Sequence, residues 1–226
     1  MHDTNEQQRP APRRRRLRIG VTAGAIALSA WAGLAPAPAS AAPRPARIAG
    51  DHHSPRVVDR ATAALAAHER FELTGTPADF VAYLRAREAT ADAVAAEMQL
   101  DPTALRLAWS RADLQHQKAV LAALTQLGVQ YRSATSAPGI GFDCSGLTAF
   151  AWGRAGVQLA RQSGAQINAA APRDESTAVA GDLLQYPGHV MMYLGVDRAI
   201  VHASNPANDV ELSFVTRAVR FGDPTG

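Results

Sequence analysis

The chain has 226 residues, of which 47% are hydrophobic and 19% charged, so most of it is expected to fold into one or two domains. Its net charge of +3 comes from residues 1–42, which hold six arginines and two acids and leave a formal charge of −1 on the remainder. A remainder without excess positive charge argues against a polyanion, and we expect no nucleic-acid partner.

Residues 1–42 have the pattern of a cleavable signal peptide. An arginine cluster precedes the apolar stretch IGVTAGAIALSAWAGLA and the small residues APASAA, and cleavage is expected near Ala41 or Ala42. A retained anchor is the alternative, but so short a stretch rich in glycine and alanine spans a bilayer poorly. The sequence therefore predicts a protein secreted to the cell envelope, with no membrane span after processing. The paired arginines also permit twin-arginine export.

Residues 43–54, PRPARIAGDHHS, have the composition of a linker, and a helical region is expected over residues 55–112. Apolar positions recur there at helical spacing: Val57, Val58, Ala61, Ala64 and Leu65, then Phe80, Val81, Leu84, Val94 and Met98, then Leu105, Leu107, Trp109 and Leu114. Thr76 with Pro77, and Asp101 with Pro102, are helix starts, and the last helix is expected to continue to Gly128. These apolar stripes are expected to pack on the domain that follows.

Cys144 is the only cysteine, so an internal disulfide is excluded, and the thiol is either a small core residue or a reactive group. It lies in the string GFDCSGL, where a loop rich in turn-forming residues leads into a helix-like run. With Asp143 as N-cap, the sulfur would lie beside unpaired N–H groups at the positive end of a helix. That environment stabilises a thiolate, and the N–H of Cys144 could hold an oxyanion.

Short strands are expected after Gly181 in GDLLQY, HVMMYLGV and AIVHAS, and helices followed by such strands indicate an α+β fold. A tight turn at Val196 and Asp197 would pair Met191 with His202 and place His189 on the same face. His189 is then a candidate base and His202 the group that orients it. A zinc site of Cys144 with both histidines, or two unrelated packed histidines, are the alternatives.

The other histidines of the mature chain are weaker candidates for the base. His52 and His53 lie in the predicted linker, His68 falls at an expected helix end, and His116 precedes the cysteine loop on a helix. We expect His68 and His116 to be solvated or capping residues.

GFDCSGL, AGDL, GHVMMYLG and IVHAS occur in this order and resemble the NlpC family of papain-like bacterial cell-wall peptidases. The similarity covers about residues 113–217 and implies a papain-like catalytic domain over 113–226, with Cys144 as nucleophile, His189 as base and His202 as third residue. It also implies that Tyr131 helps to form the pocket. The sequence departs from the family in the loop YRSATSAPGIG and at Ala160, which replaces a usual proline.

Asp143 and Ser145 flank the nucleophile and are candidate substrate-binding residues, although capping explains Asp143 equally well. Gln166 and Asp182 also match the family's pattern, and we expect them to have structural roles. The resemblance implies a cysteine endopeptidase that cuts peptidoglycan stem peptides, often between D-glutamate and diaminopimelate. We expect a monomer without metal or cofactor. A catalytically silent envelope protein that binds a partner, or an acyl transferase or amidase with the same triad, are the alternatives.

Overall fold

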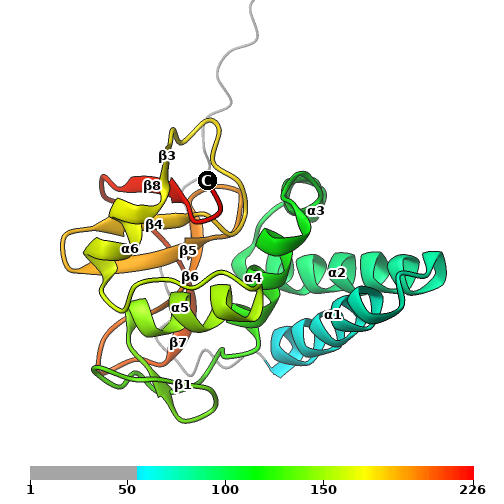
Figure 1. The fold of residues 1–226 in the computed structure, drawn as a ribbon, viewed down its shortest axis with the longest axis horizontal. Helices are drawn as coiled ribbons and strands as arrows, with labels where there is room; N and C mark the ends of the chain where they lie inside the picture. Colours follow the sequence, from blue (N-terminus) through cyan, green and yellow to red (C-terminus); the bar gives the residue numbers. More distant parts are fainter. Residues whose placement is uncertain (1–54) are drawn as a thin grey trace, which may run out of the picture. The chain divides into compact units, whose positions relative to one another are not determined.

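The computed structural model describes residues 55–226, so the predicted signal peptide (1–42) and linker (43–54) lie outside the described residues. The described part opens with four helices, α1 (Pro55–Thr74), α2 (Pro77–Met98), α3 (Pro102–Arg111) and α4 (Leu114–Leu124) (Figure 1). The helix starts predicted at Thr76 and Asp101 are confirmed. The Thr76 hydroxyl accepts the N–H of Asp79 at 3.1 Å, and the Asp101 carboxylate accepts that of Thr103 at 2.8 Å. None of the described helices is long and apolar enough to cross a membrane.

The prediction that the third helix continues to Gly128 is wrong. Helix α3 ends at Arg111, the backbone is extended at Ala112 and Asp113, and the Asp113 side chain caps α4 by accepting the N–H of His116 at 2.8 Å. The break has a local cause, since an aspartate that binds a nearby N–H favours a new helix start over a helix interior.

Eight strands and two further helices follow. These are β1 (Ser136–Ala137), β2 (Gly141–Phe142), α5 (Cys144–Arg154), α6 (Ser163–Ala169), β3 (Ala171–Arg173), β4 (Leu183–Tyr186), β5 (His189–Tyr193), β6 (Ala199–Ala203), β7 (Val210–Phe214) and β8 (Arg220–Asp223). Strands β1 and β2 form a small hairpin, and the other six form an antiparallel sheet in the order β3-β8-β4-β5-β6-β7. The predicted α+β class is confirmed.

One continuous hydrophobic core joins the four leading helices to α5 and the sheet. Helix α4 packs against both α1 and α5, and α5 and α6 pack against the central strands (Figure 1). The indole of Trp109 donates to the carbonyl of Leu194 at 2.9 Å, which ties α3 to the end of β5. Val81, Leu107 and Leu114, predicted as members of the apolar stripes, are instead exposed to 44%, 49% and 39%.

His68 and His116 are not the solvated residues that the sequence predicted, because both side chains are at most 2% exposed. Helix α1 continues six residues past His68, to Thr74, which places this ring inside the helix. It stacks edge-on against Tyr83, with ring centroids 4.8 Å apart, and burial lowers its pKa.

His116 lies in a buried ionic cluster that joins α4 to the sheet. Its Nδ1 is 3.0 Å from Asp113 Oδ1, and its Nε2 is 3.3 Å from both Asp182 Oδ1 and Asp223 Oδ1. The other oxygen of Asp223 binds Arg173. Burial lowers the pKa of His116, but the bonds to Asp182 and Asp113 outweigh burial and raise it above its usual value. The imidazolium therefore links three carboxylates from separate parts of the chain.

We expect His116→Gln to lower the free energy of unfolding by about 3 to 5 kcal/mol at pH 6, because Asp182 and Asp223 lose their buried cation. A histidine whose pKa is raised by folding contributes stability below about pH 6.5 and loses it as the pH rises through the folded value. The difference from wild type should therefore shrink at pH 9, in urea unfolding followed by circular dichroism. His68→Gln is the matched control, because burial lowers the pKa of His68 and its cost of about 1 kcal/mol should therefore not shrink at pH 9. Equal losses for the two variants would contradict the ionic role of His116.

Candidate active site

Cys144 is the first residue of α5, as the sequence predicted. Asp143 is the N-cap, with φ −93° and ψ 177°, and its Oδ1 accepts the N–H of Gly146 at 2.7 Å. The N–H groups of the first helical turn have no acceptor within the helix, and the helix dipole adds positive potential there. The half-buried thiol of Cys144 therefore lies where a thiolate is stabilised.

The loop before the cysteine is packed tightly against this helix start. The Asp143 N–H donates to the carbonyl of Thr135 at 3.0 Å, and the Ser136 hydroxyl donates to the carbonyl of Gly146 at 2.8 Å. A Cβ atom at position 146 would lie 2.1 Å from the Thr135 oxygen. Only glycine fits this position, and the close contact fixes the loop relative to Cys144.

Arg161 binds the N-terminus of α5 through both terminal nitrogens of its guanidinium group. Nη1 donates to Asp143 Oδ1 and to the Ser145 hydroxyl, each at 2.9 Å, and Nη2 donates to Asp143 Oδ2 at 2.6 Å. Burial raises the pKa of Asp143, but the bonds from Arg161 and Gly146 outweigh burial and hold it below its usual value. Arg161 was not predicted as a site residue, because no local pattern connects it to a carboxylate 18 positions earlier.

Gln166 holds the other side of the helix start. This side chain is 1% exposed, and its amide donates to the carbonyls of Ser145 at 2.9 Å and Ala160 at 2.8 Å while it accepts from the Thr148 hydroxyl at 2.6 Å. The structural role expected for Gln166 is thus observed. Asp182 likewise bonds its own turn by accepting the N–H of Val179 at 2.8 Å.

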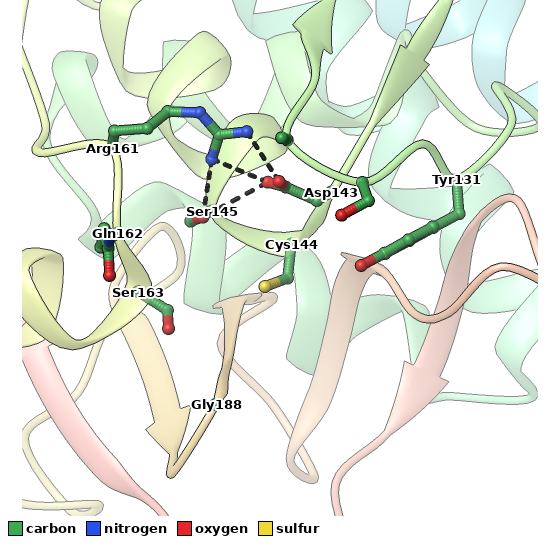
Figure 2. Close-up of a pocket in the computed structure, with 10 residues that line it drawn as sticks. Tyr131, Asp143, Cys144, Ser145, Arg161, Gln162, Ser163 and Gly188 are labelled. Carbon is green, nitrogen blue, oxygen red and sulfur yellow. Dashed lines mark hydrogen bonds and ion pairs between the residues drawn. The ribbon is translucent and has the colours of Figure 1, made fainter.

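Cys144 opens onto a pocket of about 360 Å³. Its lining comes from the cysteine loop, the start of α5, the segment before α6 and the β4–β5 turn, and comprises Tyr131, Ser133, Ala134, Asp143, Cys144, Ser145, Arg161, Gln162, Ser163 and Gly188. Figure 2 shows the sulfur between Arg161 on one side and the hydroxyl of Tyr131 on the other. Burial, Cys144 and Asp143 raise the pKa of Tyr131, so its hydroxyl stays protonated at neutral pH.

The strands that carry the two histidines are in the register that the sequence predicted. Met192 pairs with Val201, which corresponds to the expected alignment of β5 and β6. The turn itself differs from the prediction by one residue. Its central residues are Asp197 and Arg198, with φ 49° and 57°, and the N–H of Ala199 closes it on the carbonyl of Val196 at 2.8 Å.

His189 and His202 are in direct contact. His189 Nε2 and His202 Nδ1 are 2.8 Å apart, and each residue is 8% exposed. Both lie beyond the paired residues of β5 and β6, where the rings meet edge to face with centroids 5.1 Å apart. Tyr186 packs on His189, and the Arg217 guanidinium lies 4.4 Å from the Tyr186 ring centre. Burial, His202 and Arg217 lower the pKa of His189 to about 4, so this imidazole is neutral at pH 7.

A buried carboxylate lies next to the histidine pair, so that His189, His202 and this carboxylate form a row. Glu211 lies opposite His202 in the β6–β7 pairing, is 8% exposed, and has its Oε1 3.3 Å from His202 Nε2. It was not predicted as a site residue. The segment that became β7 carried no pattern from which its register against IVHAS could be read.

The structure brings the predicted residues together in two groups. Tyr131, Asp143, Cys144 and Ser145 line the pocket, whereas His189 and His202 contact each other. Gly188 of the pocket wall directly precedes His189, but in residues 55–226 no hydrogen bond joins Cys144 Sγ to either histidine. In the same residues, the group able to share one metal ion is His116 with Asp182 and Asp223, and not the alternative zinc set of Cys144 with both histidines.

Residues 128–219 match the model of the NlpC/P60 family. Through this segment the chain belongs to the NlpC/P60 family. The resemblance stated from the sequence is thereby confirmed. The matched segment contains the whole pocket lining and both histidines, whereas α1 to α4, residues 55–124, precede it.

Several relatives of known name share this domain. The chain is 41% identical over 95 residues to the peptidoglycan endopeptidase RipB of Mycobacterium tuberculosis, which covers 36% of this chain and 39% of RipB. It is 36% identical over 141 residues to a probable endopeptidase of Corynebacterium glutamicum, covering 59% and 62% of the two chains. The chain thus spans less than two thirds of the length of these curated relatives.

A solved structure is similar as well. The P60 domain of an antigen from Mycobacterium avium subspecies paratuberculosis is 31% identical, with a TM-score of 0.43, and the match covers 49% of this chain and 94% of that domain.

The lowered pKa of His189 predicts how stability varies with pH. A histidine in the unfolded chain titrates near 6.5, so between pH 6.5 and 4 the unfolded state binds a proton that the native state does not. The free energy of unfolding therefore falls as the pH is lowered through this window. We expect wild type to lose about 3 kcal/mol more than His189→Gln between pH 7 and pH 4, measured by urea unfolding. Parallel losses would mean that His189 titrates in the same way in both states.

Proposed function

We propose that this NlpC/P60 protein is a cysteine endopeptidase of the cell envelope that hydrolyses peptidoglycan stem peptides. The observation that carries the proposal is the thiol of Cys144, placed at a helix start and open to a pocket, with a buried histidine pair on the neighbouring strands β5 and β6. Relatives named as peptidoglycan or probable endopeptidases support the substrate class. The signal pattern of residues 1–42 supports export to the compartment where peptidoglycan lies.

In this proposal Cys144, His189 and His202 form a catalytic triad. His189 Nε2 is engaged with His202, which leaves Nδ1 as the nitrogen that takes the thiol proton. The thiolate attacks the amide carbonyl, and the N–H of Cys144 holds the oxyanion. Protonated His189 gives its proton to the leaving amine as the C–N bond breaks. Water, which gives a proton to His189, then attacks the thioester and releases the acid.

The resting distance between the thiol and His189 must close in this reaction, because no hydrogen bond joins them in residues 55–226. Catalytic hydrogen bonds often tighten only when substrate is bound. A rotation of the Cys144 side chain about Cα–Cβ moves the sulfur without moving the helix that carries it.

We propose that the bond cut is the one between D-glutamate and diaminopimelate. If glutamate is joined to diaminopimelate through its side-chain carboxyl, the uncut substrate carries a free α-carboxylate near the scissile amide, so a cation in the pocket would favour this substrate. Arg161 lines the pocket with a side chain that is 44% exposed, and its fork also binds Asp143 and Ser145. Guanidinium groups bind carboxylates through paired hydrogen bonds. Tyr131 and Ser145 add polar contacts to the same wall.

The first test is product analysis with purified stem peptides and mass spectrometry. We expect wild type to release the two hydrolysis products and Cys144→Ala to lose at least about a thousandfold in rate, because no other nucleophile replaces the thiol. Cys144→Ala should keep the melting temperature of wild type. Transfer products without hydrolysis would replace the proposal by an acyl transferase.

Thiol reactivity separates the enzyme from a silent envelope protein. Cys144 should react with iodoacetamide at pH 7 at least about tenfold faster than a free cysteine, whose pKa is about 8.5. His189→Gln should bring the rate back toward that of the free thiol. A wild-type rate at or below that of the free thiol would favour the silent protein.

The second test concerns substrate choice. Two stem peptides are compared, one with a free α-carboxylate on D-glutamate and one with a carboxamide there. We expect wild type to prefer the carboxylate peptide about tenfold in kcat/KM, equivalent to about 1.4 kcal/mol. Arg161→Gln should lose the preference while it still cuts both peptides, because Gln cannot form a charged pair. An unchanged ratio in this variant would assign carboxylate recognition to another residue.

A further inference from the structure

Glu211 ends a row of buried groups that begins at the proposed base. From His189 Nε2 to His202 Nδ1 the distance is 2.8 Å, and from His202 Nε2 to Glu211 Oε1 it is 3.3 Å. All three residues are 8% exposed, so water has little access to the row. Glu211 stands on β7 directly opposite His202, and the Asn208 amide, 3.3 Å away, donates to the same Oε1.

The contact between the two histidines holds a single proton, which determines the tautomer of both rings. If the base is to present an unprotonated Nδ1 to the thiol, its own proton must be on Nε2 and point at His202 Nδ1. His202 Nδ1 must then be an acceptor, so the proton of His202 must be on Nε2. That nitrogen lies 3.3 Å from Glu211 Oε1 without hydrogen-bond geometry, so the carboxylate acts on it through its charge, and a negative charge at this distance favours a proton on Nε2.

We propose that Glu211 is a positioning residue that holds His202 as its Nε2–H tautomer and thereby keeps His189 Nδ1 unprotonated. The charge of Glu211 beside His202 Nε2 favours this tautomer, and its link to catalysis rests on the function proposed above. Glu211 is not among the residues that line the pocket, and it acts through His202.

The charged groups around His189 and His202 determine how strongly the Glu211 carboxylate affects protonation of the pair. The elements that meet at the two rings offer Cys144 on α5, Tyr186 on β4 and Arg217 after β7, besides Glu211 itself. Arg217 and burial disfavour a proton on His189. Among these groups Glu211 supplies the negative charge next to the pair, so it should stabilise the imidazolium that forms when the thiol is deprotonated.

The test is nitrogen NMR of the histidine rings in wild type, Glu211→Ala and Glu211→Gln, without substrate. In wild type at pH 7 we expect His202 to be the Nε2–H tautomer and His189 Nδ1 to be unprotonated. In Glu211→Ala a substantial share of His202 should move its proton to Nδ1, and the rate of Cys144 alkylation at pH 7 should fall about tenfold. Glu175→Gln, at a surface ion pair with Arg198, is the matched control and should behave as wild type.

Glu211→Gln keeps the shape and removes the charge. The amide can either accept from or donate to His202 Nε2 and therefore enforces neither tautomer, while the pH midpoint at which the histidine pair gains a proton should fall by about one unit. If the alanine variant does not fold, the pH midpoint of the histidine pair in Glu211→Gln tests the inference. Wild-type tautomers in folded Glu211→Ala, or a wild-type midpoint in Glu211→Gln, would overturn the inference.

Stem-peptide kinetics separate this inference from the proposed function. A positioning role predicts that Glu211→Ala lowers kcat about tenfold with KM unchanged, because the substrate contacts remain. If wild type cuts no stem peptide while the tautomer and the alkylation rate still depend on Glu211, the proposed function fails and the positioning role stands. If peptides are cut and neither property depends on Glu211, the positioning role fails alone.

Discussion

The carboxylate of Asp143 meets two demands at the start of α5. One oxygen accepts the N–H of Gly146, which caps the helix, and both oxygens hold the guanidinium of Arg161. Removing the carboxylate would release the cap and leave the arginine without its partner, so the place of the sulfur and the charge of the pocket depend on the same group. The close approach of Thr135 to Gly146 and the bonds of Gln166 add to this anchoring. The pocket wall around Cys144 is thus held by several independent contacts.

The histidine side of the site is held differently. Strands β5 and β6 are paired at Met192 and Val201, and the two rings lie beyond that pairing, joined by one hydrogen bond. Burial favours the neutral form of His189 there, whereas catalysis requires this ring to take a proton. In that proton transfer, the charge of Glu211 would stabilise the imidazolium and the positive end of α5 would stabilise the thiolate. Polar groups buried in a row have strongly coupled protonation states, so each substitution should affect its neighbours.

Local patterns in the sequence were sufficient to predict the helix start at Cys144, the caps at Thr76 and Asp101, and the register of β5 against β6. Each of these depends on residues only a few positions apart. Arg161 and Glu211 escaped prediction, because their partners lie on other elements whose packing no short pattern reveals. His116 was misjudged for the same reason, since its carboxylates come from residues 66 and 107 positions later. The break between α3 and α4 was missed although Asp113 is a local cap, because the apolar spacing continued across it.

The buried cluster at His116 bears on where this protein can be divided. The family match runs from 128 to 219, yet of His116 and the two carboxylates that meet its Nε2, Asp182 and Asp223, only Asp182 lies within it. A fragment trimmed to the match would keep the pocket and both histidines but would leave Asp182 without the imidazolium and without the C-terminal strand that bears Asp223. We therefore expect a shortened form that folds by itself to begin ahead of α4 and to retain β8, so that its limits differ from those of the family match.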